Sequence, residues 1–246
     1  MSLTLKIALS PLLVAQALRT RARVPRLPEA AGPREGVAGR GGPRLRLLIA
    51  GDSSAAGVGV RTQDDALALP LARELARRCG AEVHWWLVAR SGTTNEQAWA
   101  LLEESMPEAV DVAVVVTGVN DVVDQVASQR AVRARERIAN GLRNLAGVRH
   151  VVFCPLPPVH RFPALPQPLR WMAGADARRH NNALREWVDA RAAAIGDVSR
   201  APLDELQLGS AAMASDGFHP GKPAYRQIAI AVSRHIADSV WPKLAC

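Results

Sequence analysis

Serine, aspartate and histidine residues occur in an arrangement that could carry out acyl transfer. Ser53 directly follows Gly51 and Asp52 at the end of an apolar run. Asp216 precedes His219 by three residues in a turn-rich loop. Acyl transfer needs a nucleophile, a base and a group that orients the base. Asp216 can reach the near ring nitrogen of His219, which leaves the far nitrogen free to accept a serine proton. We therefore predict Ser53, Asp216 and His219 as catalytic residues.

Three further groups could stabilise the negative oxygen that forms during such a reaction. They are the backbone N–H groups of Ser53 and Gly92 and the side-chain amide of Asn120, and each follows a different apolar run. A donor in this position typically contributes roughly 10²–10³-fold to turnover. Asparagine suits the role because it donates without a charge that would pair with the histidine. We predict these groups as the oxyanion hole, and we predict neither a metal ligand set nor a cofactor.

Apolar runs of strand length must position these groups. The runs are LRLLIAG (45–51), EVHWWLVARSG (82–92), DVAVVVTG (111–118) and HVVFCP (150–155). Segments with helical spacing follow or separate them, at 64–78, 95–104, 128–146, 176–195 and 223–240. Strands that alternate with helices form a parallel sheet covered on both faces. We therefore predict a three-layer α/β/α fold, with the chemistry beyond the carboxyl ends of the strands.

The positive charge of the chain is concentrated near its N-terminus. The net charge is +8, but residues 1–46 hold nine basic and two acidic residues, which leaves about +1 for the rest. Residues 22–43 are rich in Pro, Gly and Arg and indicate an irregular connector. We predict an N-terminal apolar helix and basic connector over residues 1–44 and one hydrolase domain over residues 45–246. Because the charge belongs to one arm, no nucleic acid partner is expected.

The apolar stretch at residues 3–18 leaves several roles open. It is short for a membrane span, and it could be a signal-peptide core, a helix docked on the domain or a helix on a membrane surface. Arginines after the stretch oppose export. A cytoplasmic location is favoured, with membrane contact through residues 1–46 or export through residues 1–17 as alternatives. The sequence does not fix the oligomeric state.

The motifs together resemble the SGNH (GDSL-like) hydrolases, over about residues 45–241. The matching blocks are Gly51-Asp52-Ser53-Ser54, Gly92, Gly118-x-Asn120-Asp121 and Asp216-x-x-His219. The resemblance implies a flavodoxin-like sheet, a metal-free serine mechanism and hydrolysis of esters or thioesters. We expect a small-molecule ester with a short or medium acyl chain, with a lipid ester or a thioester as alternatives. Ser54 stands where the family often has leucine, so Ser54 remains a second candidate nucleophile.

Two other functions remain open from the sequence. A metal-dependent phosphoesterase could use as ligands Asp52, Asn120, Asp121 and His219. A non-enzymatic membrane- or nucleic-acid-binding module would use the basic arm. The segment 155–175, which is rich in Pro and apolar residues, could line an acyl pocket, act as a lid or pack against the sheet.

Overall fold

A six-stranded sheet lies at the centre of the computed structural model, which describes residues 3–206 and 209–244. Its order in this described part of the chain is β1-β3-β2-β4-β5-β6, and only β1 runs antiparallel to its neighbour. The strands are β1 (Glu35–Ala38), β2 (Arg44–Gly51), β3 (Glu82–Ala89), β4 (Val112–Val116), β5 (His150–Phe153) and β6 (Val198–Arg200). The prediction of a mainly parallel, flavodoxin-like sheet is confirmed.

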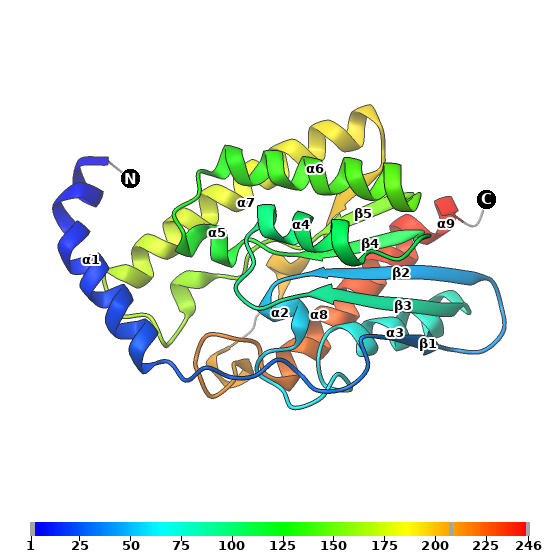
Figure 1. Cartoon of the computed structure of the whole chain (residues 1–246), viewed down its shortest axis with the longest axis horizontal. Coiled ribbons are helices and arrows are strands. Elements are labelled where there is room, and N and C mark those ends of the chain that lie inside the picture. The colour runs from blue at the N-terminus through cyan, green and yellow to red at the C-terminus, as the bar shows by residue number, and fades with distance from the viewer. Residues whose placement is uncertain (1–2, 207–208, 245–246) are drawn as a thin grey trace.

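Helices cover both faces of this sheet (Figure 1). One face packs against α3 (Ala68–Cys79) and α8 (Lys222–His235), and the other against α4 (Asn95–Ser105), α6 (Ser128–Ala146) and α7 (Leu169–Ala194). The second half of strand β2, residues 47–51, is apolar at every position. Leu47 and Ile49 contribute to one core while Leu48 and Ala50 contribute to the other. A strand buried on both faces needs apolar residues at every position.

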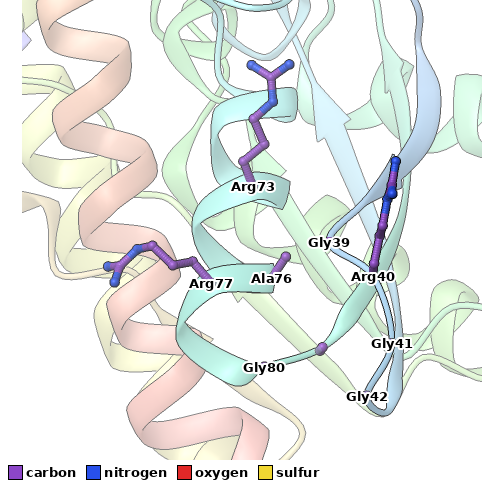
Figure 2. Close-up of a pocket in the computed structure, with 9 residues that line it drawn as sticks. Gly39, Arg40, Gly41, Gly42, Arg73, Ala76, Arg77 and Gly80 are labelled. Atoms are coloured by element: carbon purple, nitrogen blue, oxygen red, sulfur yellow. The ribbon is translucent and has the colours of Figure 1, made fainter.

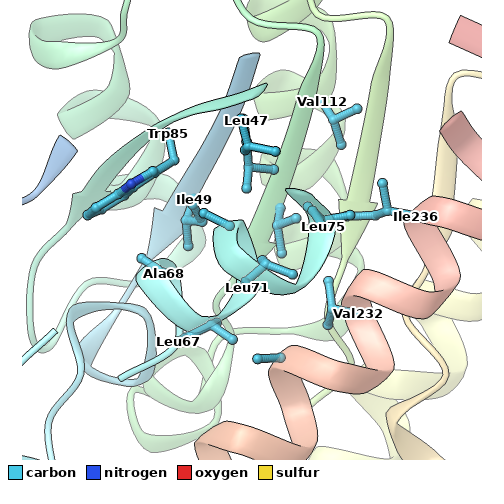
Figure 3. Close-up of a cluster of buried hydrophobic side chains, with 14 of the residues drawn as sticks. Leu47, Ile49, Leu67, Ala68, Leu71, Leu75, Trp85, Val112, Val232 and Ile236 are labelled. Carbon is cyan, nitrogen blue, oxygen red and sulfur yellow. The ribbon is translucent and has the colours of Figure 1, made fainter. Parts of the chain in front are cut away.

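The core beneath α3 follows from the helical spacing of its leucines. Leu67, Leu71 and Leu75 are fully buried, as their shared stripe predicts. Figure 3 shows them beside Trp85 of β3 and Val232 of α8. This packing fixes α8 against the sheet, and α8 follows directly after the loop that holds Asp216 and His219.

The order of the parallel strands reverses between β2 and β4. After β2 the chain forms β3 on one side, and it then returns to form β4 on the other side of β2. In open α/β sheets the carboxyl ends of two such strands diverge and leave a crevice, which is the usual place for a site. Ser53 follows one of these two strands and Asn120 follows the other.

Helix α1 (Leu3–Arg23) lies at one end of the molecule and contacts the start of α7 (Figure 1). The amide of Gln16 donates to the carbonyl of Gln167 at 2.7 Å and accepts from the backbone N–H of Leu169 at 3.1 Å. The connector prediction was wrong for residues 35–38, which form β1. Pairing with β3 covers an edge that would otherwise be open. The division at residue 44 stays a prediction.

Shorter elements lie between the main ones. They are α2 (Ser53–Ala56), α5 (Val119–Val123), η1 (Val159–Arg161), η2 (Leu203–Glu205), η3 (Ser210–Ala212), the π-helical η4 (Ile236–Val240) and α9 (Trp241–Leu244). No helix in the described ranges is both long enough and apolar enough to span a membrane.

Candidate active site

Ser53 is the first residue of α2, immediately beyond β2. A side chain at Gly51 would place its Cβ 2.1 Å from the carbonyl oxygen of Val116, so glycine is needed where β2 meets β4. Asp52 caps α2, because its carboxylate accepts the backbone N–H of Ser54 at 2.9 Å. The turn therefore starts a helix at the strand end, and the first amides of a helix have no partner within it.

His219 connects Ser53 to Asp216. Its Nε2 lies 3.0 Å from Oγ of Ser53, and its Nδ1 lies 2.5 Å from Oδ2 of Asp216. The second oxygen of Asp216 accepts the backbone N–H groups of Phe218 and His219, both at 2.9 Å. Burial opposes ionisation of Asp216, but hydrogen bonds from the His219 ring and these amides outweigh it and lower its pKa. The structure thus brings the three predicted residues together and joins the histidine to Ser53.

The loop after α2 packs on the residue that follows His219. A Cβ at Gly59, which has φ +106°, would lie 2.2 Å from the carbonyl oxygen of Pro220. The buried hydroxyl of Tyr225 in α8 donates to the carbonyl of Val58 at 2.7 Å. These contacts hold the serine and histidine loops together. They were not predictable from the sequence, because each joins segments that are distant in the chain.

Two of the predicted oxyanion residues, Gly92 and Asn120, lie close together. The amide of Asn120 donates to the carbonyl of Thr93 at 3.0 Å, one residue beyond Gly92. Gly92 has φ +84°, and no atom lies within 4 Å of the Cβ that another residue would carry. An asparagine amide has two N–H groups, so the contact with Thr93 orients the side chain and leaves a second donor.

A buried hydrogen-bond network, which we call the polar floor, lies next to Asn120. It consists of Asn95, Thr117, Asp121 and Arg135, all of which are buried. Asp121 accepts the backbone and side-chain N–H groups of Asn95 at 3.0 and 2.9 Å. Asn95 accepts the Thr117 hydroxyl at 2.6 Å, and Arg135 donates to the Thr117 carbonyl at 3.2 Å. The floor ties the start of α4 to the end of β4, next to Asn120.

Two titratable groups, Arg135 of the polar floor and the nearby Asp52, have shifted pKa values. Burial raises the pKa of Asp52 to about 7, with Asp121 adding to the rise and the Ser54 amide and Arg135 opposing it. Burial lowers the pKa of Arg135 to about 10, although Asp121 and Asp52 favour its charged form. Arg135 therefore remains charged at neutral pH and balances the two buried carboxyl groups.

The polar floor was largely missed from the sequence. Arg135 shares a helical stripe with Ala131, Ile138 and Leu142, which are all buried. This position on an apolar stripe was the one signal that could have identified it. An arginine in a helix usually faces water, so its type argues against burial.

The side chains proposed as metal ligands have other partners. Asp52 binds the Ser54 amide and Asp121 binds Asn95, while His219 lies between Ser53 and Asp216. Within the described ranges, no group of three or more His, Cys, Asp or Glu residues could hold a metal ion. The phosphoesterase alternative is not favoured.

The segment 155–175 packs beside the site. Phe162 and Leu165 are buried in a small cluster with Val122 of α5 and Leu156. The ring of Phe162 makes an edge contact with Phe218, at 5.1 Å between centroids. This cluster packs against the histidine loop through Phe218. At these residues the segment is therefore part of the packed structure and not a free lid.

A separate hollow of about 370 Å³ lies between α3 and a glycine-rich loop at residues 39–42. It adjoins the starts of β2 and β3, at the edge of the sheet opposite Ser53. Figure 2 shows Arg73 and Arg77 pointing away from this loop, and they form ion pairs with Asp64 and Glu74. This hollow is not part of the candidate active site.

A parallel α/β sheet that joins Ser, His and Asp side chains at its switch point is typical of the SGNH-type serine hydrolases. Residues 49–227 match the GDSL-like lipase/acylhydrolase family, and the chain belongs to this family. It is a carboxylic ester hydrolase, and the binding-module alternative is not favoured.

One relative in sequence agrees with this assignment, and solved structures share the fold. The chain is 28% identical to GDSL-like esterase Rv1075c of Mycobacterium tuberculosis, over 95% of this chain and 78% of that protein. A family 3 carbohydrate esterase of Clostridium thermocellum has a similar fold, with a TM-score of 0.62 and 16% identity over 82% of this chain and 99% of the other. The lipase Lip_vut3 from a goat rumen metagenome also has a similar fold, with a TM-score of 0.61. Its sequence identity is 16%, and the match covers 79% of this chain and 97% of the other.

Proposed function

We propose that Ser53 is the nucleophile of a two-step ester hydrolysis. His219 takes the serine proton while Oγ attacks the ester carbonyl carbon, and it then gives that proton to the departing alcohol. Water, deprotonated by His219, then attacks the carbonyl carbon of the acyl-serine intermediate, and His219 returns that proton to Oγ of Ser53 as the acid departs. Asp216 holds the ring orientation and stabilises its charged form. The observation that carries this proposal is the 3.0 Å contact between Ser53 and His219, which are 166 positions apart, together with the 2.5 Å contact between His219 and Asp216.

The negative oxygen of each tetrahedral intermediate would be bound by the backbone N–H groups of Ser53 and Gly92 and by the amide of Asn120. The contact between Asn120 and the Thr93 carbonyl supports this role, because it places the amide beside Gly92. Fixed donors stabilise charge at the moment it forms without reorganising.

We propose a short or medium acyl ester as the substrate. The mechanism acts on the carbonyl group, so a thioester would react by the same steps. A series of nitrophenyl esters of increasing acyl length tests this assignment. A maximum of kcat/KM at short or medium chains supports it, and a steady rise to long chains contradicts it.

An active-site fluorophosphonate tests the nucleophile. The wild-type protein should be labelled, Ser53→Ala should lose labelling, and Ser54→Ala serves as the matched control and should keep it. Labelling retained in Ser53→Ala and lost in Ser54→Ala would assign the nucleophile to Ser54.

Helix α1 provides the basis for a second proposal, contact with an anionic membrane surface. Val14 and Leu18, one helical turn apart, are 58% and 64% exposed. The arm of residues 1–46 is strongly basic, and exposed apolar groups combined with positive charge favour binding to anionic lipid. In a sedimentation assay with phosphatidylserine vesicles, the wild-type chain should pellet with the vesicles. The Val14→Ser/Leu18→Ser variant should remain in the supernatant. Equal binding of both would contradict the proposal. A cytoplasmic location stays a prediction.

A further inference from the structure

A groove of about 560 Å³ lies between the C-terminal part of α1 and the loop before α7. Its volume is typical of a small-ligand site. The α1 side is lined by residues spaced i, i+3, i+4 and i+7, which form one face of the helix: Gln16, Arg19, Thr20 and Arg23. The opposite side combines apolar residues of the loop with a third arginine, Arg170. Figure 1 shows α1 passing beside this loop.

The groove has an excess of positive charge. Among the described residues, the guanidinium groups of Arg19, Arg23 and Arg170 have no ion-pair partner. The Nε of Arg170 is shielded from solvent and also lacks a hydrogen-bond partner within the described ranges. Asp216 is the one acidic residue among the described residues that line the groove, and its side chain is fully buried and held by His219. Guanidinium groups bind phosphate and carboxylate groups in a planar, two-point geometry.

The groove adjoins the proposed catalytic residues. Its lining includes Asp216, and the backbone N–H of Ala164 donates to the carbonyl of Gly217 at 3.3 Å. In the proposed mechanism His219 protonates the departing alcohol, so that part of the substrate lies on the histidine side. The groove therefore borders the loop that holds His219, although neither Ser53 nor His219 is among its lining residues.

We propose that this groove binds the alcohol portion of an ester that carries a negative charge, a phosphate or a carboxylate. The inference rests on the proposed serine mechanism and adds a substrate class to it. The arginines of α1 and Arg170 pair with the anion, while Pro163 and Leu165 contact the carbon skeleton that links it to the ester. The enzyme then prefers esters of anionic alcohols to neutral esters with the same acyl group.

Two soluble esters that differ by one carboxylate test the preference without lipid. They are 2-nitrophenyl butanoate, which is neutral, and 3-butanoyloxy-4-nitrobenzoate, which is anionic. The wild-type chain should have the higher kcat/KM for the anionic ester. Arg19→Gln/Arg23→Gln should lower the ratio of the two kcat/KM values about tenfold. Arg170→Gln, on the opposite wall, should lower the same ratio independently.

A matched variant separates the groove from the general field of the basic arm. Arg21→Gln/Arg26→Gln removes equal charge from residues that do not line the groove, and it should keep the wild-type ratio. An equal fall in both double variants overturns the groove proposal. The proposal is also overturned if Arg19→Gln/Arg23→Gln still hydrolyses the neutral ester and has the wild-type ratio of kcat/KM for the anionic ester to kcat/KM for the neutral ester. If the wild-type chain hydrolyses neither ester and resists the phosphonate, the serine mechanism itself has failed.

Discussion

The two sides of the candidate site are built in different ways. On the oxyanion side, Asn120 stands on a polar floor whose members are buried and bonded to one another. On the histidine side, the groove is bounded by helix α1 and a surface loop, and its three arginines have no ion-pair partner among the described residues. Catalytic geometry needs rigid support, whereas substrate preference can vary on exposed elements. We expect substitutions on the first side to change turnover or stability, and those on the second to change substrate preference.

The largest effect is expected where the two sides meet. His219→Gln removes the base that contacts Ser53, and it should lower kcat/KM for a nitrophenyl ester by at least about 10³-fold. Steady-state kinetics measures this loss. His160→Gln, which changes a histidine outside the site, should retain activity. A loss of kcat/KM below tenfold in His219→Gln would show that His219 is not the catalytic base.

Loss of the side-chain donor should have the next largest effect. Asn120→Ala should lower kcat about 10²–10³-fold with little change in KM. The hydrogen bond from Asn120 is strongest in the transition state, where the carbonyl oxygen carries negative charge. Separate determination of kcat and KM gives the result. Asn182→Ala, on the exposed face of α7, is the control. A rise in KM at constant kcat would instead indicate a role in ground-state binding.

The polar floor should control stability more than substrate preference. Arg135→Met leaves Asp52 and Asp121 without their buried counter-charge, and it should cost about 3 kcal/mol of unfolding free energy. Urea unfolding measures the cost, and Arg133→Met, an exposed position on the same helix, is the control. Unchanged stability in Arg135→Met would show that the floor tolerates an apolar side chain.

A smaller effect is expected on the pH dependence of stability. The pKa of Asp52 rises from its model-peptide value of 3.8 to about 7 in the fold, so the unfolded chain releases this proton first. The contribution of Asp52 is therefore fully present below about pH 4 and is lost as pH rises towards 7. Asp52→Asn keeps an acceptor for the Ser54 amide and removes the titration. The Tm of the wild type relative to the variant should fall between pH 4 and 7, and parallel curves would contradict the shift.

The sequence predicted the parts of the molecule that depend on local pattern. Strands β2 and β4 were evident because burial on both faces makes residues 47–51 and 112–116 continuously apolar. The Ser, Asp and His residues were evident because they stand at strand ends and in a turn. Strand β1, with the sequence EGVA, and the three-residue β6 were missed. Both form through pairing with strands that are distant in sequence, and neither is long enough to show a period.

Support for the site was harder to predict for a related reason. The contact of Gly59 with Pro220 and the bond from Tyr225 to Val58 depend on how loops meet in space. The arginine groove combines one face of α1 with a loop about 140 positions later. The basic arm was visible as a charge imbalance, but which of its arginines share a surface required the fold.

Mass spectrometry of the trapped acyl-enzyme tests the central claim most directly. After brief reaction with a nitrophenyl ester and acid quenching, the acyl group should map to Oγ of Ser53, and His219→Gln should strongly reduce its formation. An acyl group on Ser54, or formation at the wild-type rate in His219→Gln, would contradict the account.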